Sequence, residues 1–346
     1  MTVHLISVGR SVLNSLEKPD DQLANRGLAT AIRHSGAHEL IPAGGDAGEQ
    51  ARAASDWVAA ALGPGDGAAG SAEPPTGPAA RLAEAAARVR PAIWPCRFSA
   101  ELETFGKVLR GACRLPDHDI AILICSDTSP GLLAAVWNAL ALTGGDFSRV
   151  RYQADLNPGQ RLARLRNHVV LIRVPHLDAR SAEDFREAMG YLGRLARRLF
   201  ESGELTTAEP FDFYLSGGYK ATIPYLIGMA EAVRSVDRVS LRALGAEHLM
   251  PDEGTYPAGA FVLHETARDD PGPIPLPLRL LDMEAVRSEL RDFDAAGHRP
   301  GIPSSTLLNG YAYEITKRKD RETCTLTAFG AGLRAFLGVG PEGFPR

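Results

Sequence analysis

Short apolar runs alternate with longer segments of helical periodicity along most of the chain. The continuous runs at residues 3–8, 120–125, 168–174 and 210–215 are typical of strands that are covered on both faces. Each run leads through a turn of small or polar residues into a helical segment. This order predicts an α/β protein with a Rossmann-like, doubly wound, mostly parallel sheet and helices on both of its faces.

The segments between these runs are expected to be helical, and two weaker runs add shorter strands. The shorter strands are expected at Val239–Leu244 and Ala260–His264. Ser99 stands where an N-cap would begin the helix that follows it. Residues 11–16 are expected to form a helix or a long turn. Helices are expected at residues 26–35, 47–62, 80–89, 100–113, 132–142, 181–200 and 221–233.

A proline-rich segment, Asp269–Leu281, separates this pattern from a C-terminal part of different character. That part contains an amphipathic helix at residues 283–295, a segment without Gly or Pro at 313–327 that fits a hairpin, and a last helix at 328–337. Helix, hairpin and helix together predict a small α+β unit of the winged-helix type.

The chain is therefore expected to form two domains, residues 1–275 and 276–346. Within the first domain, residues 62–80 are rich in Gly, Pro, Ala and Ser and nearly devoid of large apolar side chains. Such a stretch gains too little from burial to offset its ordering entropy, so we interpret it as a flexible insertion.

Composition narrows the class of protein. The 346 residues are 45% hydrophobic and 23% charged with a net charge of −4, which is ordinary for a globular protein. A protein that binds nucleic acid over its whole surface would be basic, so any such contact must be local. No apolar run approaches the roughly 20 residues of a membrane helix, and the N-terminus lacks the pattern of a signal peptide, so no membrane partner is expected.

Cysteine usage bears on the compartment and on metal binding. Cys96, Cys113, Cys125 and Cys324 stand far apart and form no CxxC pair, so neither a zinc site nor a redox dithiol is indicated. No cluster of His and carboxylate residues stands out either. We therefore expect a cytoplasmic protein without disulfides, metal or cofactor.

Candidate chemistry lies in turns that leave buried strands and enter helices. The turns at residues 7–11 and 216–220 combine glycines, which let a ligand approach the backbone, with hydroxyl groups and a mobile lysine charge. A third turn, at residues 126–131, adds polar groups at the same edge of the sheet. These turns predict a phosphate-binding site formed by Gly9, Arg10, Ser11, Ser126, Asp127, Thr128, Ser216, Gly217, Gly218, Tyr219 and Lys220.

The two Gly-containing turns do not match a common nucleotide fingerprint. The letters SGGYK do not form a P-loop, and SVGRS is not GxGxxG. A Gly-rich turn also occurs as a plain tight connection between a strand and a helix, and that alternative stays open.

The motifs SVGRSVL, SDTSPG and FYLSGGYKATIPYL resemble the CARF domain of CRISPR-associated proteins of type III systems, over roughly residues 1–281. The SGGYK turn followed by an amphipathic helix is the most specific part of this resemblance. One position departs from the family pattern, because Tyr214 stands where an Asn is expected shortly before the Gly-Gly pair.

The resemblance implies a homodimer that binds a cyclic oligoadenylate, in our interpretation cyclic tetra-adenylate, across its two-fold axis. In the ring nucleases of this family a Ser of the first loop and the Lys of the GG-x-K turn are functional, which implies catalytic roles for Ser11 and Lys220. The implied reaction needs no metal and yields linear di-adenylates with 2′,3′-cyclic phosphate ends, which switches off the antiviral response.

A second hypothesis is a non-catalytic sensor of cyclic oligoadenylate whose C-terminal unit binds DNA or a protein. The basic cluster Lys317, Arg318 and Lys319 would contact a DNA backbone in such a protein. Acidic residues are interleaved with this cluster, which favours a solvated hairpin tip over a DNA contact.

A third hypothesis is an effector ribonuclease of the kind marked by an Arg followed by a His. Arg161–His168 and Arg291–His298 have such a spacing. This spacing also arises by chance, and the part of the chain after residue 281 is short for a helical nuclease domain.

Overall fold

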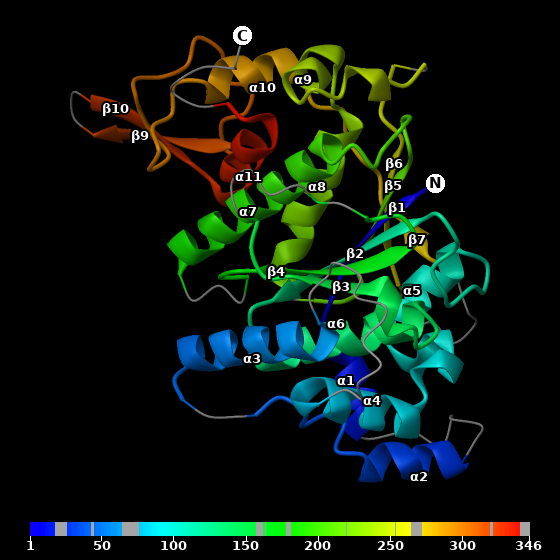
Figure 1. Cartoon of the computed structure of the whole chain (residues 1–346). Helices are drawn as coiled ribbons and strands as arrows, with labels where there is room; N and C mark the ends of the chain where they lie inside the picture. The colour runs from blue at the N-terminus through cyan, green and yellow to red at the C-terminus, as the bar shows by residue number, and fades with distance from the viewer. Residues whose placement is uncertain are drawn as a thin grey trace.

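The computed structural model describes residues 1–17, 26–42, 45–63, 76–156, 162, 164–177, 181–218, 220–252, 254–263, 272–318 and 321–339. In these residues a seven-stranded sheet lies between two layers of helices, and a three-stranded sheet belongs to a smaller C-terminal unit (Figure 1). The predicted α/β class, with a mostly parallel Rossmann-like sheet and a small C-terminal α+β unit, is confirmed.

The strands of the large sheet follow the order β3-β4-β2-β1-β5-β6-β7, and only β7 runs antiparallel to its neighbour. The four apolar runs and the run near residue 260 form strands as predicted, whereas β3 and β7 were not anticipated. The strands are β1 (Val3–Ser7), β2 (Ile120–Ser126), β3 (Val150–Gln153), β4 (His168–Val174), β5 (Phe211–Tyr214), β6 (Ala258–Val262) and β7 (Ile274–Pro275).

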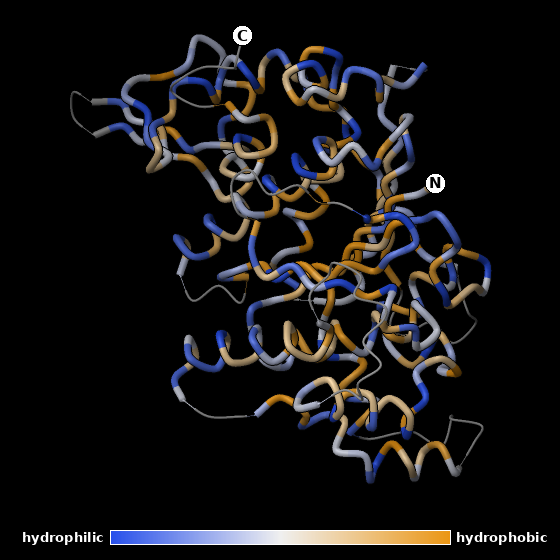
Figure 2. Tube along the Cα trace, viewed as in Figure 1, coloured by the Kyte–Doolittle hydropathy of each residue, from blue (hydrophilic) through white to orange (hydrophobic). Residues whose placement is uncertain are grey.

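Alternate residues of the strands support two hydrophobic cores, one on each face of the sheet. Val3 and Leu5 of β1 face one core, whereas Ile6 belongs to the other. Figure 2 shows hydrophobic residues concentrated along the central strands. The helices on the Ile6 face include α1 (Ser11–Glu17), α2 (Arg26–His34), α3 (Ala47–Leu62), α4 (Gly77–Val89), α5 (Ala100–Val108) and α6 (Ser129–Leu142).

The opposite face is covered by α7 (Ala182–Glu201) and α8 (Ile223–Arg234), followed by α9 (Arg238–Ala243). The last of these corrects a prediction, because Val239–Leu244 was expected to be a strand. Asp237 begins the helix instead, since its carboxylate accepts a hydrogen bond from the Ser240 amide at 2.9 Å.

None of the helices in the described ranges has the length and apolar character needed to cross a membrane.

A disulfide joins Cys96 and Cys113, whose Cα atoms lie 5.3 Å apart. The expectation of a chain without disulfides is therefore wrong. The two cysteines were too far apart in sequence to form a recognisable motif, and the fold brings them together at either end of the segment that contains α5. Cys125 and Cys324 are free and buried.

The C-terminal unit contains the helix, hairpin and helix that the sequence predicted. These are α10 (Met283–Leu290), the hairpin of β9 (Tyr313–Arg318) and β10 (Arg321–Leu326), and α11 (Ala328–Leu337). A short β8 (His298–Pro300) completes the sheet in the order β8-β10-β9. Residues 301–312, between β8 and β9, contain turns but no helix that could lie in a DNA groove.

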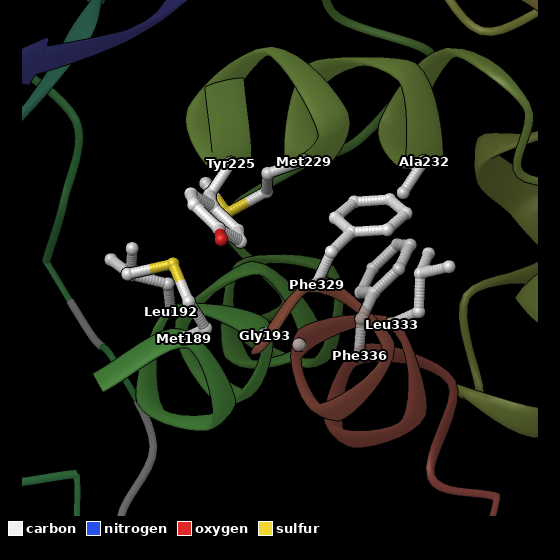
Figure 3. Close-up of a pocket in the computed structure, with 10 residues that line it drawn as sticks. Met189, Leu192, Gly193, Tyr225, Met229, Ala232, Phe329, Leu333 and Phe336 are labelled. Atoms are coloured by element: carbon white, nitrogen blue, oxygen red, sulfur yellow. The ribbon is translucent and has the colours of Figure 1, made fainter. Parts of the chain in front are cut away.

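Helix α11 packs directly on α7 and α8. A Cβ at Gly193 of α7 would overlap the carbonyl oxygen of Gly332, and one at Gly228 of α8 would overlap the ring of Phe329. Figure 3 shows Phe329 and Phe336 of α11 pointing into the space between these helices. That space has a volume of about 20 Å³, so the three helices enclose little more than a water-sized void.

Two carboxylates of the large unit bind the arginines of the segment that follows β7. Glu231 of α8 accepts from the Arg279 Nε at 2.7 Å and from the Tyr311 hydroxyl at 2.7 Å. Asp237 accepts from Arg287 at 2.8 Å. Burial alone would raise the pKa of Glu231, but the bonds from Arg279 and Tyr311 hold it below its usual value.

The division into two domains at residue 275 stays a prediction.

The close approach of α7 and α11 can be tested by adding one methyl group. We expect Gly193→Ala to lower the free energy of unfolding by about 1–3 kcal/mol, because the new Cβ forces the two helices apart. Gly190→Ala on the same helix is the matched control, since only the end of the Arg194 side chain lies near it and Ala favours the helix. Urea unfolding measures both variants, and equal losses would contradict the proposed contact.

Candidate functional site

The strand order brings the two Gly-containing turns to one place. β1 lies between β2 and β5, and all three strands are parallel, so the turns that leave β1 and β5 are neighbours at the carboxyl edge of the sheet. The chain passes from β1 to β2 on one side and later crosses to β5 on the other. This reversal is the topological switch point, where open α/β sheets usually bind ligands.

The two turns touch each other through their glycines. A Cβ at Gly9 would lie 2.6 Å from the Gly218 amide nitrogen, so no side chain fits between them. Gly218 has a φ of +87°, which favours glycine, and a Cβ there would also overlap the Ser7 hydroxyl. The spacing of glycines in the sequence therefore reflects a direct backbone contact between the two turns.

A buried carboxylate that the sequence analysis did not identify joins these turns. Glu101, in the first turn of α5, is only 2% exposed. One of its oxygens accepts a hydrogen bond from the Gly9 amide at 2.6 Å, and the other accepts from the Ser11 hydroxyl. The same carboxylate lies against Gly217, where a Cβ would overlap it.

Ser11 is consequently bound on both sides by α5. Its hydroxyl donates to Glu101 and accepts from the Ala100 amide at 3.1 Å. The polar groups of the first loop were expected to bind a phosphate. In the structure they bind the carboxylate of Glu101 instead. No local signal could reveal this, because Glu101 lies about ninety residues from the loop and an acidic residue in a first helical turn is common.

An open pocket of about 430 Å³ lies beside this junction. Its volume is in the range of small-molecule sites. Lys107 and Lys220 both line it, and Lys107 forms an ion pair with Glu103 at 3.0 Å. Lys220 begins a short 3-10 helix, Lys220–Thr222, ahead of α8. The pocket is formed on one side by α5 with Ala100, Glu103 and Lys107, and on the other by the Gly-Gly turn with Ser216, Gly217 and Lys220.

The remaining residues of these two turns have separate environments. The Ser216 hydroxyl accepts from the Leu263 amide at 2.8 Å, which ties the second turn to the end of β6. Arg10 is exposed and lies 3.6 Å from Glu17, as on an ordinary helix surface. Tyr219 lies outside the described residues.

The third turn reaches the same edge of the sheet but does not line this pocket. The hydroxyls of Ser126 and Thr128 bond to each other at 2.9 Å, and Thr128 caps α6. Asp127 lies 3.8 Å from Arg173 and accepts from the His176 amide at 3.4 Å. These side chains thus serve the start of α6 and the end of β4.

Tyr214 belongs to the core. Its side chain is 1% exposed, and its hydroxyl lies 2.9 Å from Nδ1 of His4, whose Nε2 lies 3.1 Å from Asp119. Burial raises the pKa of the Tyr214 hydroxyl above its usual range. Tyr214 stands where the sequence motif was expected to have an Asn. Its buried side chain on β5 contacts His4 on β1 and so stabilises the pairing of these two strands.

His168 and His298, the histidines of the two Arg–His spacings, both lie on β-strands. Nδ1 of His168 on β4 bonds to the Arg166 carbonyl at 2.7 Å, and Nδ1 of His298 on β8 lies 3.2 Å from the Thr325 hydroxyl. Arg161 lies outside the described residues. Among the described residues, no three His, Cys, Asp or Glu side chains converge as metal ligands would.

Comparison with known proteins adds no identification. No protein-family model matches the chain, and no curated protein is similar to it. The fold and the geometry at the switch point define a Rossmann-like α/β protein with a small C-terminal unit, and any function must be argued from the pocket.

Removing the internal carboxylate should destabilise the junction. Glu101→Ala leaves the Gly9 amide and the Ser11 hydroxyl without their acceptor, so we expect a loss of about 2–4 kcal/mol in the free energy of unfolding. Glu103→Ala is the matched control, because it breaks only a half-exposed ion pair with Lys107 and should cost about 1 kcal/mol or less. Urea unfolding compares the two, and similar losses would contradict the role of Glu101.

Proposed function

We propose that the protein binds a cyclic oligoadenylate, most simply cyclic tetra-adenylate, and cleaves it as a CARF-type ring nuclease in CRISPR-associated antiviral defence. The observation that carries this proposal is the contact between the two motif turns beside a pocket lined by two lysines. These are the turns that carry the sequence resemblance. The cell compartment in this proposal is the cytoplasm.

The pocket suits a phosphate of such a ligand. Lys220 lines the pocket on the side of the Gly-Gly turn, Lys107 lines it in an ion pair with Glu103, and Gly217 allows a phosphate to approach the backbone. Positive groups fixed around a phosphate stabilise the negative charge that develops on its non-bridging oxygens during cleavage. In this proposal Lys220 has that role, and Lys107 is a second charge that the sequence did not suggest.

The proposed reaction uses a nucleophile that the substrate brings. A ribose 2′-oxygen attacks the adjacent phosphorus, its proton leaves to solvent or a nearby base, and the bond from phosphorus to the 5′-oxygen breaks. The 5′-oxygen takes up a proton, which opens the ring to a linear tetra-adenylate. The same step at the opposite phosphate then gives two linear di-adenylates with 2′,3′-cyclic phosphate ends. The protein contributes in-line placement and charge stabilisation, and no metal takes part in this scheme.

In the proposal, Ser11 positions the first loop as well as contacting the ligand. A hydrogen bond donated by the Ser11 hydroxyl to a ligand phosphate requires that hydroxyl to leave Glu101. In the proposal, Ser11 and Glu101 together hold the first loop against the Gly-Gly turn, and a ligand phosphate competes with Glu101 for the Gly9 amide and the Ser11 hydroxyl. Glu101→Gln should therefore strengthen binding of the anionic ligand, because it removes the competing negative charge.

A homodimer is part of the proposal. One pocket of about 430 Å³ is small for a cyclic tetranucleotide, and two copies of the pocket facing each other would match the two-fold symmetry of that ring. The test is the mass of the protein in solution with and without ligand, and a strictly monomeric complex would contradict this part.

The experiment that tests the activity uses purified protein, cyclic tetra-adenylate and EDTA, with products separated by chromatography and identified by mass. Linear di-adenylates with cyclic phosphate ends are the expected result. Intact ligand that co-elutes with the protein would favour a sensor, and intact ligand without binding would overturn the proposal for this ring size.

Lys220→Ala should abolish cleavage or reduce it at least a hundredfold, because it removes the charge nearest the proposed phosphate position. Lys317→Ala is the matched control, since Lys317 is 70% exposed on the hairpin and pairs with Glu322. Single-turnover rates at saturating protein separate an effect on cleavage from an effect on binding. Wild-type rates in Lys220→Ala would contradict the assignment.

The alternative is a non-catalytic sensor, and one observation favours it. The Ser11 hydroxyl is already bonded on both sides within the protein, so it is not poised to take part in cleavage, as expected of a protein that binds the ligand without cleaving it. A DNA contact by the C-terminal unit in that alternative would use Lys317, Arg318 and Lys319, although Lys317 pairs with Glu322 at 2.7 Å and residues 301–312 contain no recognition helix. Lys319 lies outside the described residues.

A further inference from the structure

A second and larger hollow runs along the seam between α7 and α11. It has a volume of about 900 Å³, and many of its lining residues are glycine or alanine. Five arginines line the groove, namely Arg186, Arg194, Arg197 and Arg198 of α7 and Arg334 of α11.

Carboxylates neutralise these arginines only in part. Arg197 and Arg198 share one partner, Glu201, at 2.7 and 3.1 Å. Arg186 donates instead to the Ala296 carbonyl at 3.5 Å. Glu183 and Glu187 are the acidic residues that line the described part of the groove, so with Glu201 three carboxylates stand against five arginines.

Arg334 adds a partly buried positive charge to the groove. Its guanidinium bonds to the main-chain oxygens of Asp294 and, at 2.9 Å, of Val339, which carry no net charge. Burial therefore holds the pKa of Arg334 below its usual value, even though Asp294 acts in the opposite direction. An anion bound beside it would relieve this cost.

The arrangement of the arginines matches a linear ligand. From Arg186 to Arg198 the stripe follows α7 for about 18 Å at 1.5 Å per residue. Guanidinium groups bind phosphates through paired hydrogen bonds. Small lining residues, Gly190 among them, keep the groove open for a sugar–phosphate backbone beside the helix contact.

The shape of the groove distinguishes between nucleic acids. α7 and α11 are in close contact at Gly193 and Gly332, and helices packed in this way have axes roughly 8–10 Å apart. The groove of about 900 Å³ lies over this contact rather than within it, and this volume suits a few nucleotides of a single strand better than a duplex. Aromatic side chains, which would stack on bases, are absent from the residues that line the groove in the described part of the chain.

We propose that this groove binds the phosphodiester backbone of a single-stranded nucleic acid without preference for sequence. This site lies on the C-terminal unit and α7, so it does not depend on the function proposed for the switch-point pocket.

The test measures fluorescence anisotropy of a labelled single-stranded RNA and a DNA of about 12 nucleotides and mixed sequence, between about 50 and 200 mM salt. We expect binding that weakens steeply with salt. Arg194→Gln should weaken it several-fold and reduce the salt slope by about 0.7, the value of one phosphate contact on a single strand. Arg194 is exposed and packs on the Tyr191 ring at 5.4 Å, so the fold should tolerate this change.

Arg242→Gln is the matched control, because Arg242 is an exposed arginine on α9 that pairs with Glu247 at 2.9 Å. Arg186→Gln is a second variant within the groove and should act as Arg194→Gln does. Equal affinity in wild type and both groove variants would overturn the proposal. So would a preference for a duplex, or binding of inorganic tripolyphosphate without any binding of the strands.

Discussion

The candidate site depends on one buried carboxylate. Glu101 binds the Gly9 amide and the Ser11 hydroxyl and lies against Gly217, so it joins the turns that follow β1 and β5 to the start of α5. Nearly complete burial of an acidic group is costly unless its hydrogen bonds are satisfied. The disulfide between Cys96 and Cys113 closes the chain around α5 and helps to keep that helix in position. The shape of the pocket is thus fixed by contacts between distant parts of the sequence.

Helix α7 packs on the large sheet and also on α11 of the C-terminal unit. At Gly193 it accepts α11 so closely that no side chain fits between the backbones. The arginines of the groove lie on the same helix, beside this contact. The ion pair of Arg279 with Glu231 adds a second attachment of the C-terminal unit, on α8. The groove is therefore a property of the docked arrangement, since α7 or α11 alone would present only half of it.

Patterns that act locally were predicted well. β2 and β4 were evident because a continuous apolar run has few alternatives to a strand covered on both faces. β3, with its mixed sequence VRYQ, gave no such signal, and Val239–Leu244 was misinterpreted because the cap from Asp237 outweighs a short apolar run. The glycines of the site were found because turns require them, whereas Glu101 and Lys107 were missed because only tertiary packing brings α5 to the turns.

The position of β1 has a consequence for the order of folding during synthesis. Although β1 comes first in the chain, Val3 pairs with Ile120 on one side and Phe211 on the other. The ribosome must therefore release more than half of the polypeptide before the central strand has both of its neighbours. Until then at least one edge of β1 stays unpaired beside an apolar surface, and such features recruit chaperones and promote aggregation. The pocket, which needs the turns after β1 and β5 together, can form only after that step.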